Sequence, residues 1–164
     1  AVIAPDIQLK SNRCFQSSSA HQNPHLLERP SRRWITFYQK IYKYYPIYAI
    51  YEKVAGACHF IFNQIIQKKN VKKELKQFIY ATFGAFIIFH RSFFESGGCL
   101  GHGGFLFAEE IFVAEQLREL GLKAVYDDRL KVLHFEHASM VYKKRRDRHK
   151  YLKESYLYIL SRYY

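Results

Sequence analysis

Apolar positions recur at helical spacing between Ile111 and Gly121, after a turn formed by the glycine pair Gly103-Gly104. This spacing predicts a helix that begins at two adjacent acids and ends at Gly121, because glycine is common just past a helix C-terminus. The apolar stripe of this helix consists of Val113, Leu117 and Leu120.

The two acids at the start of this helix are Glu109 and Glu110. At about 100° per residue they lie on either side of the centre of the apolar stripe, whereas Glu115 and Glu119 point away from it. An ionised acid taken out of water needs a partner, a metal or an altered pKa. The alternative is that acids in the first turn only complement the helix macrodipole. The helix pattern leaves both interpretations open.

The N-terminal part of the chain predicts one strand, one long loop and a helical region. Ala1–Leu9 is a short apolar run typical of a strand, and residues 10–33 predict a polar loop that is either acceptor-facing, a lid or disordered. From Trp34 to Gln67, aromatic residues at helical spacing predict helices with a break near Pro46. These aromatics alternate with lysines, which fits an interfacial helix on lipid headgroups and also an ordinary helix with its rings packed inward. Charged residues interrupt the stretch too often for it to span a bilayer.

The middle of the chain predicts a charged helical connection over residues 67–77, followed by a buried strand. The run Phe78–Phe89 is almost continuously apolar, as expected for a strand buried on both faces. Gly84 within it indicates a bulge or a place where a ligand approaches the backbone. His90–Glu95 then predicts a short helix, and Ser96-Gly97-Gly98 a turn.

After the central helix, the pattern predicts two strands, Leu122–Tyr126 and Leu130–His137, joined by a turn at Asp127-Asp128. His134 would lie on an apolar face of the second strand with its imidazole inward, either as a core residue or as a metal ligand. Tyr151–Tyr164 predicts a helix that carries a basic cluster at its start and has an apolar side of Leu152, Tyr156, Ile159 and Leu160.

Composition adds a strong positive charge to this picture. The chain has 164 residues, enough for one domain or a part of one, and 49% of them are apolar. Its net charge of +12 favours a polyanionic neighbour such as nucleic acid, an acidic membrane surface or a phosphorylated substrate. The basic residues concentrate in 68–76 and 143–150 without a nucleic-acid-binding motif, so a solvated basic face or a membrane contact is favoured. The widely spaced Cys14, Cys58 and Cys99 suit a reducing compartment and offer no disulfide framework.

Taken in order, these features resemble the C-terminal half of family 2 glycosyltransferases, of the rhamnosyltransferase-like type that builds surface polysaccharide. The resemblance is closest over Thr82–Ser139 and thinner over Ala1–Gln16, while 34–76 would be a variable helical insertion and 141–164 a basic C-terminal helix. It implies an α/β chain with the GT-A fold, in which helices flank a mixed sheet. The matching features are Gly84-Ala85-Phe86, Arg91, the glycine-rich turn, Phe105 to Glu110, the helix ended by Gly121, and Val132-x-His134.

The resemblance implies inverting transfer of a sugar from a nucleotide-sugar donor to a polysaccharide or lipid-linked acceptor. Glu110 takes the position of the general base that deprotonates the acceptor hydroxyl, and Glu109 would orient the acceptor or tune Glu110. His134 takes the position of a histidine that helps bind a divalent metal, Mg²⁺ or Mn²⁺, at the departing diphosphate. The acceptor side would be lined by Gly84, Ala85, Phe86, Arg91 and His102.

Two positions depart from the family pattern, since residue 110 is Glu rather than Asp and Gly101-His102 stands where relatives have an Asp-Glu pair. The donor-binding half with its Asp-x-Asp motif has no counterpart in these residues. We therefore expect an acceptor-side fragment that is inactive alone and needs the metal only together with that half. Its expected location is cytoplasmic or peripheral at the inner face of the plasma membrane. The alternative is a non-catalytic basic module that binds a membrane surface or nucleic acid, with the acids as helix caps.

Overall fold

The structure is a computed structural model, and it describes residues 1–9, 28–66, 78–104, 106–134 and 145–164. Three expectations therefore fall wholly or largely outside the described residues. They are the long polar loop up to residue 27, the charged connection over 67–77, and the end of the last predicted strand beyond His134.

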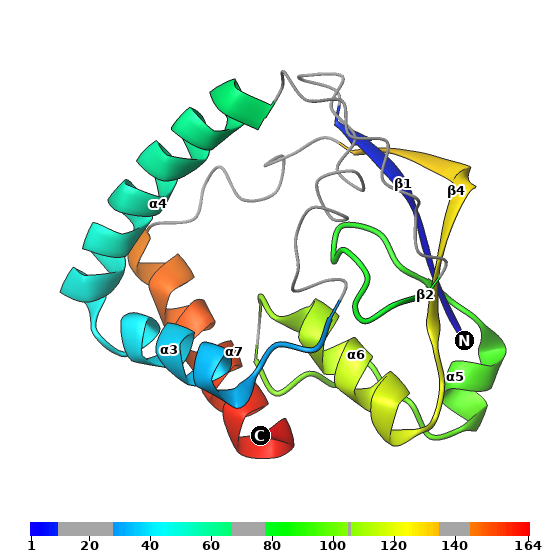
Figure 1. The fold of residues 1–164 in the computed structure, drawn as a ribbon. Coiled ribbons are helices and arrows are strands. Elements are labelled where there is room, and N and C mark those ends of the chain that lie inside the picture. The colour runs from blue at the N-terminus through cyan, green and yellow to red at the C-terminus, as the bar shows by residue number, and fades with distance from the viewer. Residues whose placement is uncertain (10–27, 67–77, 105, 135–144) are drawn as a thin grey trace.

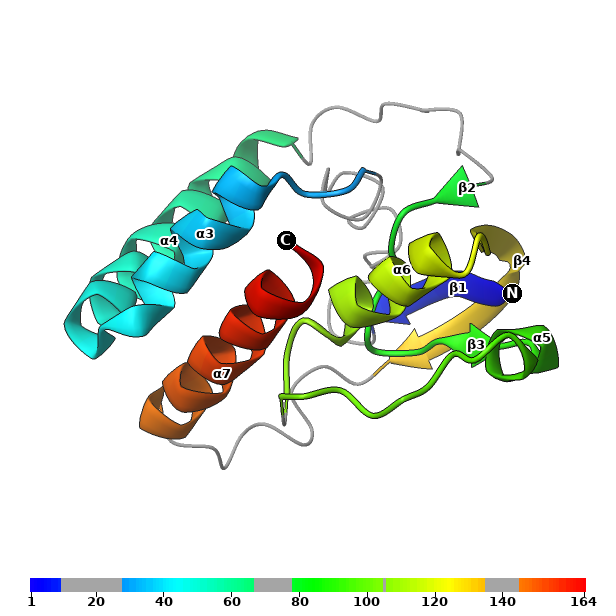
Figure 2. The same ribbon diagram turned by 90° about the horizontal axis from the view of Figure 1, so that it is seen from below.

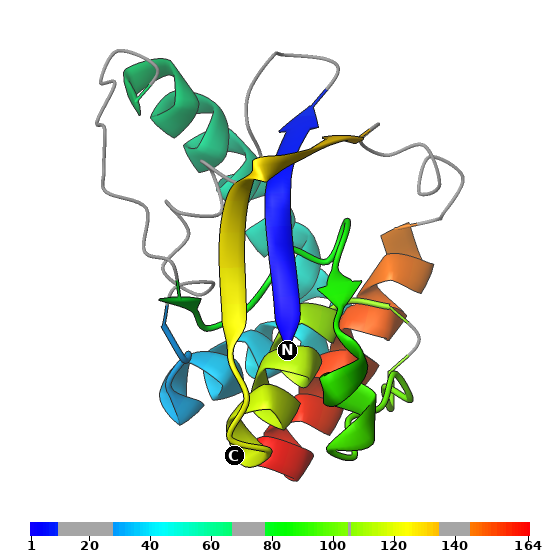
Figure 3. The same ribbon diagram turned by 90° about the vertical axis from the view of Figure 1, so that its right-hand side faces the viewer.

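The described strands form one four-stranded sheet with the order β2-β4-β1-β3. Its centre is the parallel pair β1 (Val2–Leu9) and β4 (Ala124–His134). The two edges are antiparallel and short, with β2 (Phe78–Ile79) beside β4 and β3 (Ile88–Phe89) beside β1. Figure 3 shows the central pair in front, with helices behind it. The predicted α/β class with a mixed sheet flanked by helices is confirmed.

The main helices lie at increasing distance from the sheet, and the most distant of them form the opposite edge of the molecule (Figures 1 and 2). Helix α6 (Glu109–Glu119) lies beside the sheet, and α7 (Arg145–Tyr163) lies on the far side of α6. Beyond them, α3 (Arg32–Lys43) and α4 (Tyr45–Ile66) pair as a helical hairpin that contacts α7. The short helix α5 (Arg91–Glu95) lies near the C-terminal end of α6.

The apolar interior has two main parts, and α7 contributes to both. One cluster joins the sheet, α5, α6, α7 and the start of α3, and includes Val2, Ile35, Phe112 and Ile159. The other lies where α3, α4 and α7 meet and is built largely from tyrosine rings such as Tyr42 and Tyr48. Most tyrosines of the hairpin thus pack inward, one of the two interpretations that the sequence left open, whereas Tyr44 and Phe37 are exposed.

The apolar run Phe78–Phe89 is not one buried strand, so this prediction is wrong. Only its two ends pair with the sheet, and a turn at Gly84-Ala85 separates them. The sheet order explains the difference, because β2 and β3 lie on opposite edges and the chain between them must pass β4 and β1. As a consequence, Phe78 and Phe86 are exposed rather than buried.

The two strands predicted after the central helix form the single strand β4, and the turn expected at Asp127-Asp128 is a bulge. Pro5 pairs with Asp127, but the next residue of β1 pairs with Lys131, so extra residues of β4 bulge out at this point. The Asp127 carboxylate stabilises the bulge by accepting hydrogen bonds from the backbone and guanidinium N–H groups of Arg129.

The remaining helix predictions are confirmed, with shifts at their ends. Tyr44 adopts an extended conformation that separates α3 from α4, two residues before Pro46. Helix α7 begins at Arg145, six residues earlier than the apolar pattern indicated, so the basic cluster occupies its first turns. Among the described residues, no helix is both long and apolar enough to cross a membrane.

Candidate active site at the N-terminus of α6

Helix α6 begins after a strained backbone. Phe107 (φ 72°) and Ala108 (φ 60°) are consecutive non-glycine residues in the left-handed region, which costs about 1–2 kcal/mol for each such residue. The Ala108 side chain cannot cap the helix. The carboxylate of Glu109 accepts a hydrogen bond of 2.8 Å from the backbone N–H of Phe107, in the strained segment before the helix. Strain of this kind persists only where the surroundings enforce it, and it is often found at functional sites.

The surroundings that enforce this backbone come from α7. Ser155 is buried and its hydroxyl donates a hydrogen bond to the Leu106 carbonyl oxygen. A Cβ atom on Gly103 would collide with the ring of Tyr158, and one on Gly104 would collide with the Ser155 hydroxyl. The glycine pair therefore allows the segment before α6 to lie directly against α7.

The Glu110 carboxyl faces the turn that replaces the middle of the predicted strand. A Cβ atom built on Gly84 would lie 3.4 Å from both Cδ and Oε1 of Glu110, so the backbone of this turn lies against the carboxyl group. Burial raises the pKa of Glu110 from 4.5 to about 7. The negative charge of Glu109 acts in the same direction, and the backbone N–H of Glu110 opposes it.

Two further polar groups lie in the segments that surround this carboxyl. Tyr156 of α7 is near enough for the charge of Glu110 to add to the effect of burial, and both raise the pKa of the phenol. Thr82, two residues before Gly84, is 1% exposed, and its hydroxyl has no hydrogen-bond partner within the described part of the chain. Sequence reasoning missed both groups, because neither belongs to a recognisable motif.

The structure brings Glu109, Glu110 and Gly84 together, with Ala85 and Phe86 in the same turn. His102 lies beside the first turns of α6, where its ring packs against Phe112 and Tyr158 with centroid separations of 5.1 and 5.3 Å. Its Nδ1 contacts the backbone of Gly104, and its buried Nε2 has no partner among the described residues.

Two of the predicted site residues lie elsewhere. Arg91 is an exposed residue of α5, where it pairs with Glu95, and α5 lies toward the opposite end of α6 from Glu110 (Figures 1 and 2). His134 is the last residue of β4, paired in register with Leu9. Within the described ranges, no group of three or more His, Cys, Asp and Glu side chains could hold a metal ion.

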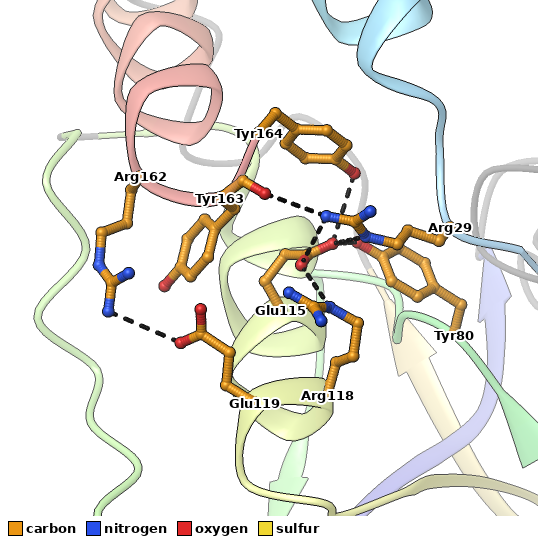
Figure 4. Close-up of polar contacts among 8 residues, drawn as sticks. All are labelled: Arg29, Tyr80, Glu115, Arg118, Glu119, Arg162, Tyr163 and Tyr164. Carbon is orange, nitrogen blue, oxygen red and sulfur yellow. Dashed lines mark hydrogen bonds and ion pairs between the residues drawn. The ribbon is translucent and has the colours of Figure 1, made fainter.

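Glu115 was expected to point away from the packed side of α6, and this prediction is wrong, because its side chain is 0% exposed. Figure 4 shows the cluster around it. Arg29 Nε donates to Oε1 at 2.7 Å, Arg118 Nε to Oε2 at 2.8 Å, and the Tyr80 hydroxyl to Oε1 at 2.7 Å. Burial by itself would raise the pKa of Glu115, but these hydrogen bonds outweigh it and lower the pKa.

The Glu115 cluster ties four segments together. Arg29 also donates a hydrogen bond of 3.0 Å to the Tyr163 carbonyl oxygen, so the segment before α3 and the end of α7 are joined through one guanidinium. Because every polar atom of the Glu115 carboxylate is engaged by protein groups, we assign the cluster a structural role. Glu119 does point outward as expected, and it pairs with Arg162 at 3.6 Å (Figure 4).

The fold defines the chain as an α/β protein with a small mixed sheet, a class that serves many functions. No known family model, curated protein or solved structure matches this chain. Among the features of this molecule, the site at the start of α6 has the chemistry that bears most directly on function.

Proposed function

We propose that this chain is the acceptor-side part of an inverting glycosyltransferase with the GT-A fold, of the family 2 type that builds surface polysaccharide. Glu110 would be its general base. The observation that carries the proposal is a carboxyl group whose pKa is raised to about 7, at a strained helix N-terminus and against the backbone of the Gly84 turn. A base is most effective when its pKa lies near the working pH.

In the proposed reaction, the Glu110 carboxylate takes the proton of an acceptor hydroxyl as that oxygen attacks the anomeric carbon of the donor sugar. The new glycosidic C–O bond forms on one face while the bond to the nucleotide diphosphate breaks on the other, which inverts the anomeric centre. The diphosphate leaves with the bonding electron pair, and the proton remains on Glu110 until it passes to solvent. The raised pKa supports this role because it increases the proton affinity of the carboxylate.

Glu109 and the Gly84 turn have supporting roles in this proposal. The hydrogen bond from Phe107 fixes the Glu109 carboxylate beside Glu110, where its charge helps to raise the Glu110 pKa. The turn offers backbone and the half-exposed ring of Phe86 to an acceptor. A sugar ring with apolar faces and hydroxyl groups suits such a mixed surface.

A divalent metal is not part of the proposed steps. His134 is the residue that the resemblance assigns to Mg²⁺ or Mn²⁺, but one histidine does not make a metal site, and among the described residues it belongs to no group of three or more potential ligands. The nucleotide-sugar donor would bind in the half of the fold that these residues do not include.

The test of the proposal uses the complete gene product with a panel of nucleotide-sugars, and it measures release of the nucleotide diphosphate in the presence of glycan acceptors. Glu110→Gln should lower kcat by about 10²- to 10⁴-fold with little change in donor affinity, because the amide cannot accept the proton. Glu119→Gln, an exposed acid of the same helix, is the matched control and should retain activity. Full activity of the Glu110→Gln variant would refute the assignment of the base.

A further inference from the structure

We propose that the outer face of the α3–α4 hairpin is a docking surface for an anionic lipid bilayer. This proposal concerns a part of the molecule remote from Glu110, and it does not rest on the proposed transferase activity. Figures 1 and 2 show the hairpin at the edge of the molecule, on the opposite side from the sheet.

The hairpin exposes an apolar stripe along α4. Ile47, Ile50 and Val54 follow one another at intervals of three and four residues, so they share one face of the helix, and Ile50 is 65% exposed. The face of α4 that contacts α7 carries Tyr48 and Glu52 instead. The stripe therefore faces away from the rest of the molecule.

Helix α3, the other member of the hairpin, exposes basic residues and a further aromatic ring. Arg32, Arg33 and Lys40 line a shallow hollow of about 570 Å³ together with Thr36 and the exposed ring of Phe37. Lys43 follows in the last turn, and α3 contains no acidic residue.

The negative charge of the hairpin is turned inward. The only acid in the α4 sequence is Glu52, and its carboxylate is bound by Arg145 and Arg148 of α7. The exposed side chains of the hairpin therefore combine an aliphatic stripe with basic groups that pair with no acid among the described residues. This combination is complementary to anionic headgroups above an apolar acyl layer.

The same observations favour a lipid surface over nucleic acid. Sequence-independent binding of single strands relies on exposed aromatic rings for base stacking. The hairpin uses most of its rings internally, since Tyr38 and Tyr42 pack against Tyr156 of α7. Besides the rings of Phe37 and Tyr44, it exposes the aliphatic side chains Ile47, Ile50 and Val54, which stack with no base but gain by entering the boundary between headgroups and acyl chains.

The first experiment measures flotation of the protein with phosphatidylcholine vesicles, with and without phosphatidylglycerol. The wild type should bind only when phosphatidylglycerol is present. The variant Ile47→Ser/Ile50→Ser/Val54→Ser should lower the partition coefficient at least about tenfold, because the stripe no longer inserts. The control Leu100→Ser/Leu130→Ser/Leu133→Ser removes three exposed leucines elsewhere and should bind like the wild type.

The second experiment measures how much the basic residues contribute to vesicle binding. Lys40→Ala/Lys43→Ala should weaken binding about 30-fold, at about 1 kcal/mol for each lysine. The control Lys123→Ala/Lys131→Ala removes two exposed lysines of the sheet region and should bind within about twofold of the wild type.

Three results would overturn the docking proposal, provided that circular dichroism shows each variant to be folded. The first is that hairpin and control variants bind vesicles equally. The second is that the wild type fails to bind vesicles that contain phosphatidylglycerol. The third is that it binds single-stranded RNA more tightly than these vesicles and the serine variant binds that RNA equally well, which would identify nucleic acid as the partner. None of these results bears on the Glu110→Gln assay.

Discussion

Two carboxyl groups on α6, the fully buried Glu115 and the partly buried Glu110, have pKa values that move in opposite directions. Burial raises the pKa of Glu110 to about 7, whereas the hydrogen bonds from Arg29, Tyr80 and Arg118 overcome burial and lower the pKa of Glu115. The difference lies in their partners. Glu115 is bound by two guanidinium groups, which stabilise its charged form, whereas the Glu110 carboxyl faces the backbone of the Gly84 turn and lies next to a second acid, Glu109. One carboxyl is therefore suited to accept a proton near neutral pH, and the other to remain ionised.

We expect Glu110 to destabilise the folded protein as the pH rises from about 4.5 to 7. Between the unfolded pKa of 4.5 and the folded pKa of about 7, the native state keeps a proton that the unfolded state has lost, so the free energy of unfolding falls with pH. Glu110→Gln should therefore match the wild type at pH 4 and exceed its stability by about 2–3 kcal/mol at pH 8. Urea denaturation of both proteins at each pH measures this difference. A stability gap that stays constant with pH would contradict the raised pKa.

Glu115 should show the opposite pH dependence. Its lowered pKa contributes stability above the unfolded value of 4.5, and this contribution is lost as the pH falls through the folded value. Glu115→Gln should cost about 3 kcal/mol at pH 7, because the amide leaves the guanidinium groups of Arg29 and Arg118 without their buried counter-charge. The test is to compare the losses of stability of Glu115→Gln and Glu119→Gln by thermal denaturation at pH 7, where Glu119 pairs with Arg162 at the surface. That exposed pair should contribute less than about 1 kcal/mol, so an equal loss for both variants would contradict the structural role of Glu115.

At the level of single residues, the sequence located the acidic pair at the start of α6 but misplaced Glu115. The helical wheel assumed one apolar stripe, whereas every residue from Ile111 to Leu117 is buried in the structure. A wheel cannot reveal partners such as Arg29, Tyr80 and Tyr164, which lie 86, 35 and 49 residues away along the chain. Buried charge clusters of this kind are set by long-range contacts that periodicity does not encode.

At the level of elements, the long periodic segments were predictable and the short strands were not. The helices over 32–66, 109–119 and 145–163 were predictable from apolar residues at helical spacing over several turns, although α6 is buried on every side between Ile111 and Leu117. The run Phe78–Phe89 carries only apolar character, which does not distinguish one central strand from two edge strands joined by a turn. Which of these forms is decided by the sheet order, and that order depends on pairing with β1 and β4.

The end of α6 provides a prediction at this level. Gly121 has a φ of 67°, and its position just past the helix is one where an L side chain is strained although no atom would clash with it. Gly121→Ala should lower the free energy of unfolding by about 1 kcal/mol. Gly101→Ala is the control, since open space also surrounds that residue but its φ is not in the left-handed region. We expect no loss of unfolding free energy for Gly101→Ala. An equal loss for both variants in urea denaturation would show that the left-handed conformation of Gly121 is not what makes alanine unfavourable there.

At the level of the whole molecule, the two apolar clusters meet on α7. Tyr156 packs against the cluster of the sheet and α6 and also against the tyrosine cluster of the hairpin. Its ring lies 5.0 Å from that of Tyr42 and 5.9 Å from that of Tyr38, measured between centroids. A shared side chain of this size makes the stability of one cluster depend on the other.

We therefore expect Tyr156→Ala to destabilise the entire protein by about 3–5 kcal/mol in a single cooperative transition. The chain has one tryptophan, Trp34 of α3, which packs against the cluster of the sheet and α6 with its ring 6.4 Å from Tyr156. Its fluorescence therefore reports on the packing of α3 against that cluster, while far-UV circular dichroism reports on all helices. Both signals should shift together to lower urea concentration. Leu157→Ala, at an exposed neighbouring position, should move neither by more than about 0.5 kcal/mol. If the circular dichroism transition separates into two phases and Trp34 fluorescence follows only one of them, the two parts unfold independently, and Tyr156 does not couple the two clusters.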